Sequence, residues 1–327
     1  MARGQSLDAR LASLENLKED PFCEAAIGEL RRTLADPSNI LAARAAEIVG
    51  ESGLSDLVPD LAAAFDRFME DPTKSDKECL AKTAIVGTLN DLDYEDEALF
   101  FRGIRHVQLE WLWGDPSIDT AADLRGRCGF ALARLRHPDT FFELTALLVD
   151  REPHARRSAV SSLGCLECER SELLLRMKAL TGDFEPPVVG ECFSALRRIS
   201  PTRSLDFVAG FLDHKDPPVA EGAAIALGES RRPEAFELLR ERWEGYPDPT
   251  FRKMLLLPIA LFRSYEALDF LLGVVTQDPL ALAAPAVTSL KLYRNDDDRC
   301  ARVRRAVVDR DNATVSAAYE IEFGPLT

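Results

Sequence analysis

The chain has 327 residues, of which 46% are hydrophobic, and it carries a net charge of −15. The apolar content excludes a disordered chain, and the length exceeds what one ordinary core holds, which favours a repeat array. The longest apolar runs, such as residues 254–262, reach about half a membrane span, and residues 1–8 lack an apolar signal core. We therefore expect a soluble, cytoplasmic protein with no membrane partner.

The charge is unevenly distributed along the chain. Residues 1–120 hold 24 acidic and 12 basic residues, a net of −12, whereas residues 121–327 hold 31 and 28, a net of −3. This asymmetry fits either a solvated acidic surface or a basic partner that docks near the N-terminus. The seven cysteines are an odd number, which argues against a disulfide framework.

An acidic residue followed by proline recurs along the chain, each time before an Ala-rich stretch predicted to be helical. These steps begin at Asp36, Asp71, Asp115, Glu152, Glu185, Asp216, Asp248 and Asp278. From Glu152 onward they recur every 30 to 33 residues, and a ninth helix without the proline is expected at 315–324. A second amphipathic stretch separates consecutive steps, so each unit is predicted to be a helical hairpin.

The residue types at each step suggest how the second helix of a hairpin begins and ends. Proline suits a first helical turn, where its missing N–H would be unpaired in any case. The preceding acid is expected to cap the exposed amides, as Asp216 would. A glycine that follows the last large apolar residue, such as Gly228, is expected to end the helix.

Two positions of the second helix repeat most clearly. Counted from the first apolar residue, position 5 is small or apolar, and its residues are Ala45, Cys128, Ala159, Cys192, Ala223, Leu255 and Ala286. Position 9 is large and apolar, and its residues are Val49, Leu132, Leu163, Leu196, Leu227, Ile259 and Leu290. Both positions lie on one helical face, where the small residue would let a neighbouring helix approach closely.

Over about residues 30–324 this pattern resembles the HEAT-repeat superfamily, in particular the short HEAT-like repeats of the phycobilisome-lyase type. The clearest copies contain Asp216, Pro217, Val219, Ala223, Leu227 and Gly228, and Glu152, Pro153, Ala155, Arg156, Ala159, Leu163 and Gly164. We predict an all-α fold, an α-solenoid of about nine helical hairpins in a single domain over residues 1–327. The resemblance implies that the helix after each turn lines the concave, binding face.

The repeat at about 72–127 is longer than the others and less regular. Its acidic run, residues 91–97, lacks the glycine and glutamate that an EF-hand loop requires, so we expect a solvated loop and not a calcium site. Four residues that follow are candidates for a ligand pocket or a peptide anchor, and they are His106, Gln108, Trp111 and Trp113. The alternative is that these aromatics fill a wider gap in the core.

Cysteines are the other residues with a metal-like spacing. Cys165 and Cys168 form a single CxxC, whereas a structural zinc site needs four ligands. Cys128 and Cys192 occupy the small position 5 and are expected in the core. We therefore predict no metal and no cofactor.

Basic residues cluster near the start of the predicted second helices in three repeats. The candidate binding residues are Arg125, Arg127, Arg156, Arg157, Arg252 and Lys253. On a concave face they would form a stripe that grips carboxylates or phosphates. The alternative is an internal ladder, in which each arginine binds a turn carboxylate such as Asp150 or Glu152. Both interpretations stay open, and one arginine can serve both roles.

These observations favour a non-enzymatic interaction scaffold that binds a protein or peptide on its concave face. The alternative is a ligand-binding or lyase-like enzyme with a pocket around His106, Trp111 and Trp113. Relatives implied by the resemblance include bilin lyases, a di-iron hydroxylase and a DNA glycosylase. No histidine here precedes a glutamate, as the hydroxylase's iron ligands do, and the acid excess argues against binding nucleic acid.

Overall fold

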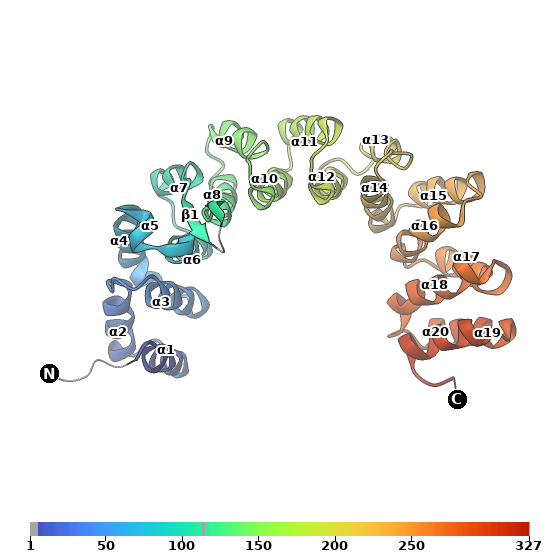
Figure 1. Cartoon of the computed structure of the whole chain (residues 1–327), viewed down its shortest axis with the longest axis horizontal. Helices are drawn as coiled ribbons and strands as arrows, with labels where there is room; N and C mark the ends of the chain where they lie inside the picture. Colours follow the sequence, from blue (N-terminus) through green and yellow to red (C-terminus); the bar gives the residue numbers. More distant parts are fainter. Residues whose placement is uncertain (1–5, 113–114, 327) are drawn as a thin grey trace. The chain divides into compact units, whose positions relative to one another are not determined.

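The computed structural model describes residues 6–112 and 115–326, and its secondary structure is almost entirely helical (Figure 1). The chain divides into two units, Met1–Glu167 and Cys168–Thr327. The N-terminal unit contains α1 Leu7–Asn16, α2 Glu24–Leu34, α3 Asn39–Ser52, α4 Val58–Met69, α5 Pro72–Ser75, α6 Leu80–Asp91, α7 Glu97–Ile104, α8 Ala122–Leu135, α9 Thr140–Leu147 and α10 Pro153–Leu166. Its two strands are β1 Leu109–Leu112 and β2 Asp115–Asp119. The prediction of a single domain stays a prediction.

The C-terminal unit is helical throughout its described residues. It contains α11 Glu169–Thr181, α12 Pro186–Ile199, α13 Leu205–Ala209, α14 Pro217–Ser230, α15 Pro233–Gly245, α16 Pro249–Leu261, α17 Tyr265–Gln277, α18 Leu280–Leu290, α19 Asp297–Arg310 and α20 Ala313–Phe323. No helix in the described part of the chain has the length and apolarity needed to span a bilayer.

The helices pair into hairpins, as the acid-proline steps predict. Among the described residues the pairs are α2/α3, α4/α6, α7/α8, α9/α10, α11/α12, α13/α14, α15/α16, α17/α18 and α19/α20. Within each unit the second helices of successive hairpins pack directly on one another in one layer, and the first helices form the other layer (Figure 1). The all-α solenoid of about nine hairpins is confirmed.

The two repeating positions form the core between these layers. All seven residues at position 5 are fully buried, and the seven at position 9 are at most 2% exposed. Cys128 and Cys192 are among them, so their prediction as core residues is confirmed. Small side chains at position 5 allow close packing of neighbouring second helices, and large ones at position 9 fill the remaining space.

The turns differ from the prediction in the residue that stabilises them. Proline does lie in the first turn of α10, α12, α14 and α16. The expected acidic cap is present before α16, where Asp248 accepts from the Thr250 N–H at 3.0 Å, but Asp216 makes no such bond. In two other turns the stabilising carboxylate lies two residues before the expected cap. Asp150 and Asp183 accept the N–H groups of residues 152 and 185 at 2.9 and 2.8 Å.

Glycine also plays a different role from the one expected. Gly228 lies inside α14, which continues to Ser230 and ends at Arg231 with a left-handed φ of 52°. A Cβ on Gly228 would lie 2.1 Å from the carbonyl oxygen of Pro258 in α16. This glycine is therefore required for the close approach of two second helices and does not end its own helix.

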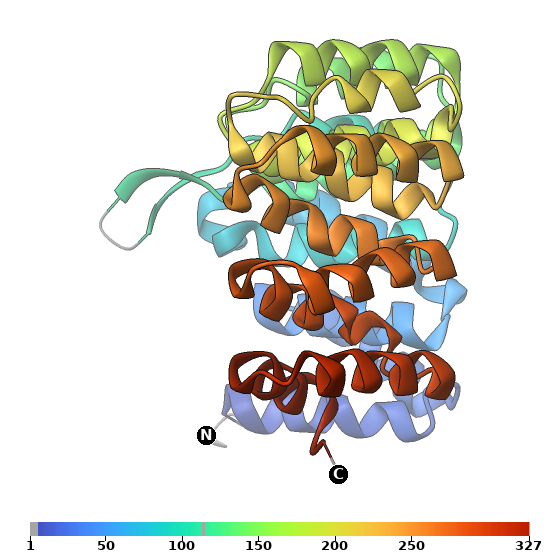
Figure 2. The ribbon, with the colours of Figure 1, turned by 90° about the vertical axis from the view of Figure 1, so that its right-hand side faces the viewer.

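The prediction that a helix begins at the Asp115 step is wrong. Asp115 and Pro116 belong to β2, not to the start of a helix, and α8 begins only at Ala122. Strands β1 and β2 pair antiparallel, with Leu109 opposite Asp119 and Glu110 opposite Ile118. The hairpin that they form projects beyond the ends of the unit's helices (Figure 2). The irregularity of this repeat thus comes from an inserted β-hairpin.

The contact at Gly228 predicts the effect of a single methyl group. Gly228→Ala should lower the free energy of unfolding by about 1–3 kcal/mol, because a helix backbone cannot move aside as a side-chain tip can. Gly273→Ala in α17 is the matched control, since nothing lies within 4 Å of the added Cβ. The control should raise stability by about 0.5–1 kcal/mol through backbone entropy. Equal melting temperatures for the two variants would contradict the packing role of Gly228.

Candidate functional site

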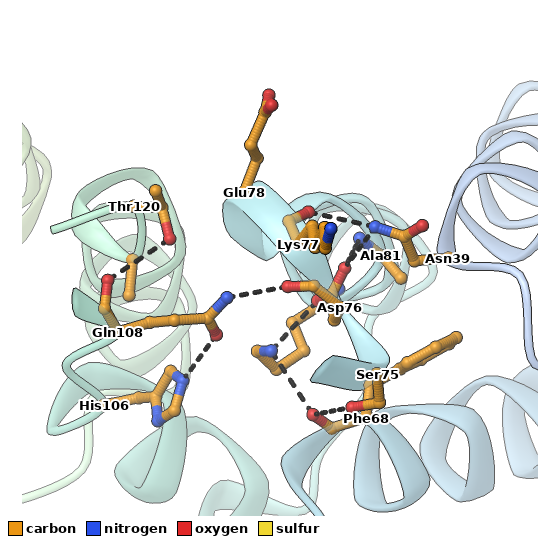
Figure 3. Close-up of polar contacts among 12 residues, drawn as sticks. Asn39, Phe68, Ser75, Asp76, Lys77, Glu78, Ala81, His106, Gln108 and Thr120 are labelled. Atoms are coloured by element: carbon orange, nitrogen blue, oxygen red, sulfur yellow. Dashed lines mark hydrogen bonds and ion pairs between the residues drawn. The ribbon is translucent and has the colours of Figure 1, made fainter. Parts of the chain in front are cut away.

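The base of the β-hairpin rests on a buried ion pair (Figure 3). Lys82 Nζ lies 3.0 Å from Asp76 Oδ2, and both side chains are fully buried. Asp76 also accepts the N–H groups of Ala81 and Lys82 at 2.8 and 3.0 Å, and Lys82 Nζ donates to the carbonyl of Phe68 at 3.3 Å. Each charge therefore has both an opposite charge and further hydrogen bonds, which burial of an ion pair requires.

The backbone beside this ion pair adopts an unusual conformation. Glu78 and Cys79 have consecutive left-handed φ values of 60° and 53°, which residues other than glycine rarely adopt. Both carboxylate oxygens of Glu110, on β1, accept the Glu78 N–H at 3.0 Å. The hairpin thus holds this turn in place through a buried carboxylate.

Gln108 and His106 complete the attachment of the hairpin, and both lie on its buried side. The amide nitrogen of Gln108 donates to the Asp76 carbonyl at 2.7 Å and also to Glu110. Its amide oxygen lies 3.1 Å from His106 Nε2, so that nitrogen is the donor. Burial lowers the pKa of His106, which keeps the imidazole neutral near pH 7. We call Asp76, Lys82, Gln108 and Glu110 the hairpin clamp.

The strand alternation of β1 separates residues that were expected to share a pocket. Gln108 and Glu110 are buried in the clamp, whereas Val107, Leu109 and Trp111 on the opposite side are 58%, 51% and 71% exposed. Trp111 is therefore not brought together with His106 and Gln108, and it does not fill the core. Trp113, the fourth candidate, lies outside the described residues. A polar–apolar alternation over residues 106–111 is the sequence signal that identifies this strand.

The structure places Arg125 in an internal ladder. It is buried, with one guanidinium nitrogen 2.8 Å from Asp119, and it forms a two-point ion pair with Asp150 at 2.8 and 2.9 Å. It also donates to the carbonyl of His106 at 2.9 Å. Arg125 thus ties the end of the hairpin to the turn before α10, and these contacts favour the structural alternative for this residue.

Arg156 and Arg252 also bind turn groups. Arg156 is buried and donates to the carbonyls of Asp150 and Arg151, both at 2.9 Å. Arg252 donates to the carbonyls of Trp243 and Tyr246 at 3.0 and 2.8 Å and lies over the Trp243 ring. Both arginines therefore bind turns through backbone carbonyls, whereas the ladder interpretation expected turn carboxylates.

The remaining basic candidates are exposed. Arg127 forms an ion pair with Asp123, one helical turn away, at 3.2 Å, and Arg157 lies exposed on α10. Lys253 is exposed on α16 and is the only one of the six basic candidates that lines the groove described next.

A groove of about 590 Å³ lies in the C-terminal unit, at the starts of α14 and α16. Its apolar lining includes Leu212, Pro217, Pro218, Ala220, Phe251 and Met254. Its polar lining includes Asp213, His214, Glu221, Tyr246, Asp248 and Lys253. Apart from Lys253, none of these residues is expected from the sequence to bind a partner. The one sequence signal for this groove is Ala220. It occupies the position of the second helix at which three other repeats have Arg125, Arg156 and Arg252.

The sequence comparisons identify HEAT repeats in the same region. Residues 173–255 match the family model of HEAT repeats, a range that contains the groove, so the predicted HEAT repeats are present. No curated protein matches the chain.

Three solved structures are similar to this chain at low sequence identity. The complex of CpcE and CpcF of phycocyanin lyase from Nostoc sp. PCC7120 is 19% identical, covers 73% of this chain and 91% of its own, and has a TM-score of 0.35. Human deoxyhypusine hydroxylase in complex with glycerol is 17% identical, with coverages of 80% and 92% and a TM-score of 0.31. An engineered protein is 12% identical, with coverages of 89% and 86% and a TM-score of 0.34. Similarities this distant carry no argument about function.

The hairpin clamp predicts a large cost for removing one of its charges. Lys82→Met should lower the free energy of unfolding by about 3–5 kcal/mol, because the Asp76 carboxylate would stay buried without its cation. Lys74→Met is the matched control, since Lys74 and Asp71 form an exposed pair at 2.8 Å, and its effect should stay within about 0.5 kcal/mol. The double variant Asp76→Asn/Lys82→Met should recover part of the loss in urea denaturation, and a purely additive double variant would contradict the coupling.

The arginine ladder predicts different outcomes for two arginines on α8. Arg125→Met should destabilise the protein by about 3–5 kcal/mol, because it strands two partly buried carboxylates. Arg127→Met, which removes an exposed pair, should change stability by no more than about 0.5 kcal/mol. Chemical denaturation of both variants checks this, and equal stabilities would argue that Arg125 is not a ladder residue.

Proposed function

We propose that this protein is a non-enzymatic interaction module that binds a protein or peptide partner on the face formed by its second helices. The observation that carries the proposal is the groove at the starts of α14 and α16. The groove has the size and the mixed apolar and polar lining of a site that takes several side chains of a ligand. It includes Lys253, one of the binding residues expected from the sequence.

The packing of the C-terminal unit supports assignment of the second helices to the concave side. α12, α14, α16, α18 and α20 pack on one another without interruption, whereas contacts along the row of first helices are sparser. A row of closely packed helices is shorter than a row of spread ones, so the closely packed row lies inside the unit's curve (Figure 1). A partner held there would contact several repeats at once.

Two further observations fit the same proposal. On β1, Trp111 lies on the opposite side from His106 and Gln108, which favours an interaction module over an enclosed ligand pocket around these residues. All seven cysteines are free thiols, which is compatible with a cytoplasmic location.

Obstruction of the groove tests the proposal. Thr250 is exposed in the groove wall, and Thr250→Trp should lower the recovery of partners from the native cell by about tenfold, a loss of about 1.4 kcal/mol in binding. The matched control is Glu241→Trp, which adds the same bulk at an exposed position of the first helix α15. Both variants should keep the wild-type melting temperature. Equal recovery of partners by both variants would contradict binding in this groove.

A further inference from the structure

We infer that the groove of the C-terminal unit binds an extended partner segment that carries a lysine or arginine beside an apolar side chain. This inference rests on the proposed function and specifies the chemistry of its partner. Three features of the groove carry it: an ordered aromatic pair, an excess of carboxylates, and the absence of a ladder arginine from the α14 wall.

The aromatic pair gives the groove a rigid surface for a cation. The rings of Tyr246 and Phe251 lie 4.6 Å apart and are tilted by 32°. The Tyr246 hydroxyl donates to Asp213 Oδ1 at 2.7 Å, and Arg242 holds Asp213 Oδ2 at 2.6 Å. The hydrogen bond to Asp213 raises the pKa of Tyr246, so the phenol stays neutral and protonated. An ordered, electron-rich ring of this kind attracts lysine and arginine side chains.

The charges that line the groove select for a basic segment. Three carboxylates, Asp213, Glu221 and Asp248, line it against one lysine, Lys253. Asp213 is already committed to Arg242 and Tyr246, but Glu221 has no side-chain hydrogen bond or ion pair within the described residues. Asp248 caps α16 through its Oδ1 atom alone. Two carboxylates thus remain to receive a cation, which makes the groove complementary to a basic partner.

The α14 side of the groove has no arginine that could neutralise the carboxylates of Glu221 and Asp248. In their repeats Arg125 and Arg156 follow the first apolar residue of the second helix, and each places a guanidinium in the turn region. At the same position α14 has Ala220, which lines the groove and carries no charge. Pro217, Pro218 and Met254 supply the apolar surface beside it. A partner's basic side chain would occupy the place of the missing arginine while its apolar neighbour packs on the prolines.

The same features argue against an acidic or nucleic-acid ligand. A phosphate or a partner carboxylate would face Glu221 and Asp248 with only Lys253 as counter-charge. Like charges brought together at a binding surface lower the affinity. A basic extended peptide is therefore the ligand class that the groove fits best.

Three synthetic peptides of equal length test the inference on the full-length protein. Each carries a fluorescein label and a leucine–X–leucine centre in a glycine–serine frame, with X as lysine, glutamine or glutamate. By fluorescence anisotropy the lysine peptide should bind about tenfold more tightly than the glutamate peptide, and its affinity should fall as salt rises. Glu221→Lys should abolish or reverse this preference, whereas Glu241→Lys, the matched surface control, should leave it unchanged.

The outcomes separate this inference from the proposed function. Tighter binding of the glutamate peptide, or equal binding of all three peptides, would overturn the basic-segment inference and leave a groove that still binds a partner. If no peptide binds but Thr250→Trp still loses its native partner, the basic-segment chemistry is wrong and the interaction module stands. If no peptide binds and Thr250→Trp behaves like its control, both proposals fall.

Discussion

The close approach of successive second helices is the constraint on which the rest of this structure depends. Most of the second helices have a small residue where they meet their neighbours, as at Ala159 and Ala223, and at Gly228 no side chain fits at all. Gly228 meets the Pro258 carbonyl directly, so the spacing of α14 and α16 is set by backbone against backbone. Because each repeat contacts mainly its neighbours, these local spacings determine the curvature of a unit and hence the shape of its second-helix face.

Much of this fold was predictable from the sequence because the core residues follow a repeating pattern, whereas the loop residues do not. A small or apolar residue followed four positions later by a large apolar one marks every second helix from α3 to α18 except α6, and all of these residues are buried. The turn chemistry was less predictable. Asp150 and Asp183 stabilise their turns from two residues before the expected cap, and proline in the first helical turn gives no indication of which carboxylate does so.

The β-hairpin and the site residues were harder to predict for physical reasons. Asp115 and Pro116 have the local signature of a helix start, but Asp115 pairs with Leu112 in an antiparallel hairpin. The hairpin also reverses the usual burial pattern, since Gln108 and Glu110 are buried while Leu109 and Trp111 are exposed. Such a pattern is stable only because the clamp satisfies every buried polar group that it contains, and sequence alone cannot show those partners. For Arg125 the choice between ladder and binding stripe likewise depended on the position of Asp119, which lies on the unexpected strand.

The position that follows the first apolar residue of the second helix therefore has two different roles in this chain. Where it holds Arg125, a guanidinium joins the hairpin to the next turn and neutralises the carboxylates of Asp119 and Asp150, and where it holds Arg156, a guanidinium binds turn carbonyls. Where it holds Ala220, the turn region is open and the carboxylates of Glu221 and Asp248 face a groove. The carboxylates that a ladder would have paired internally are then left to select the charge of the partner.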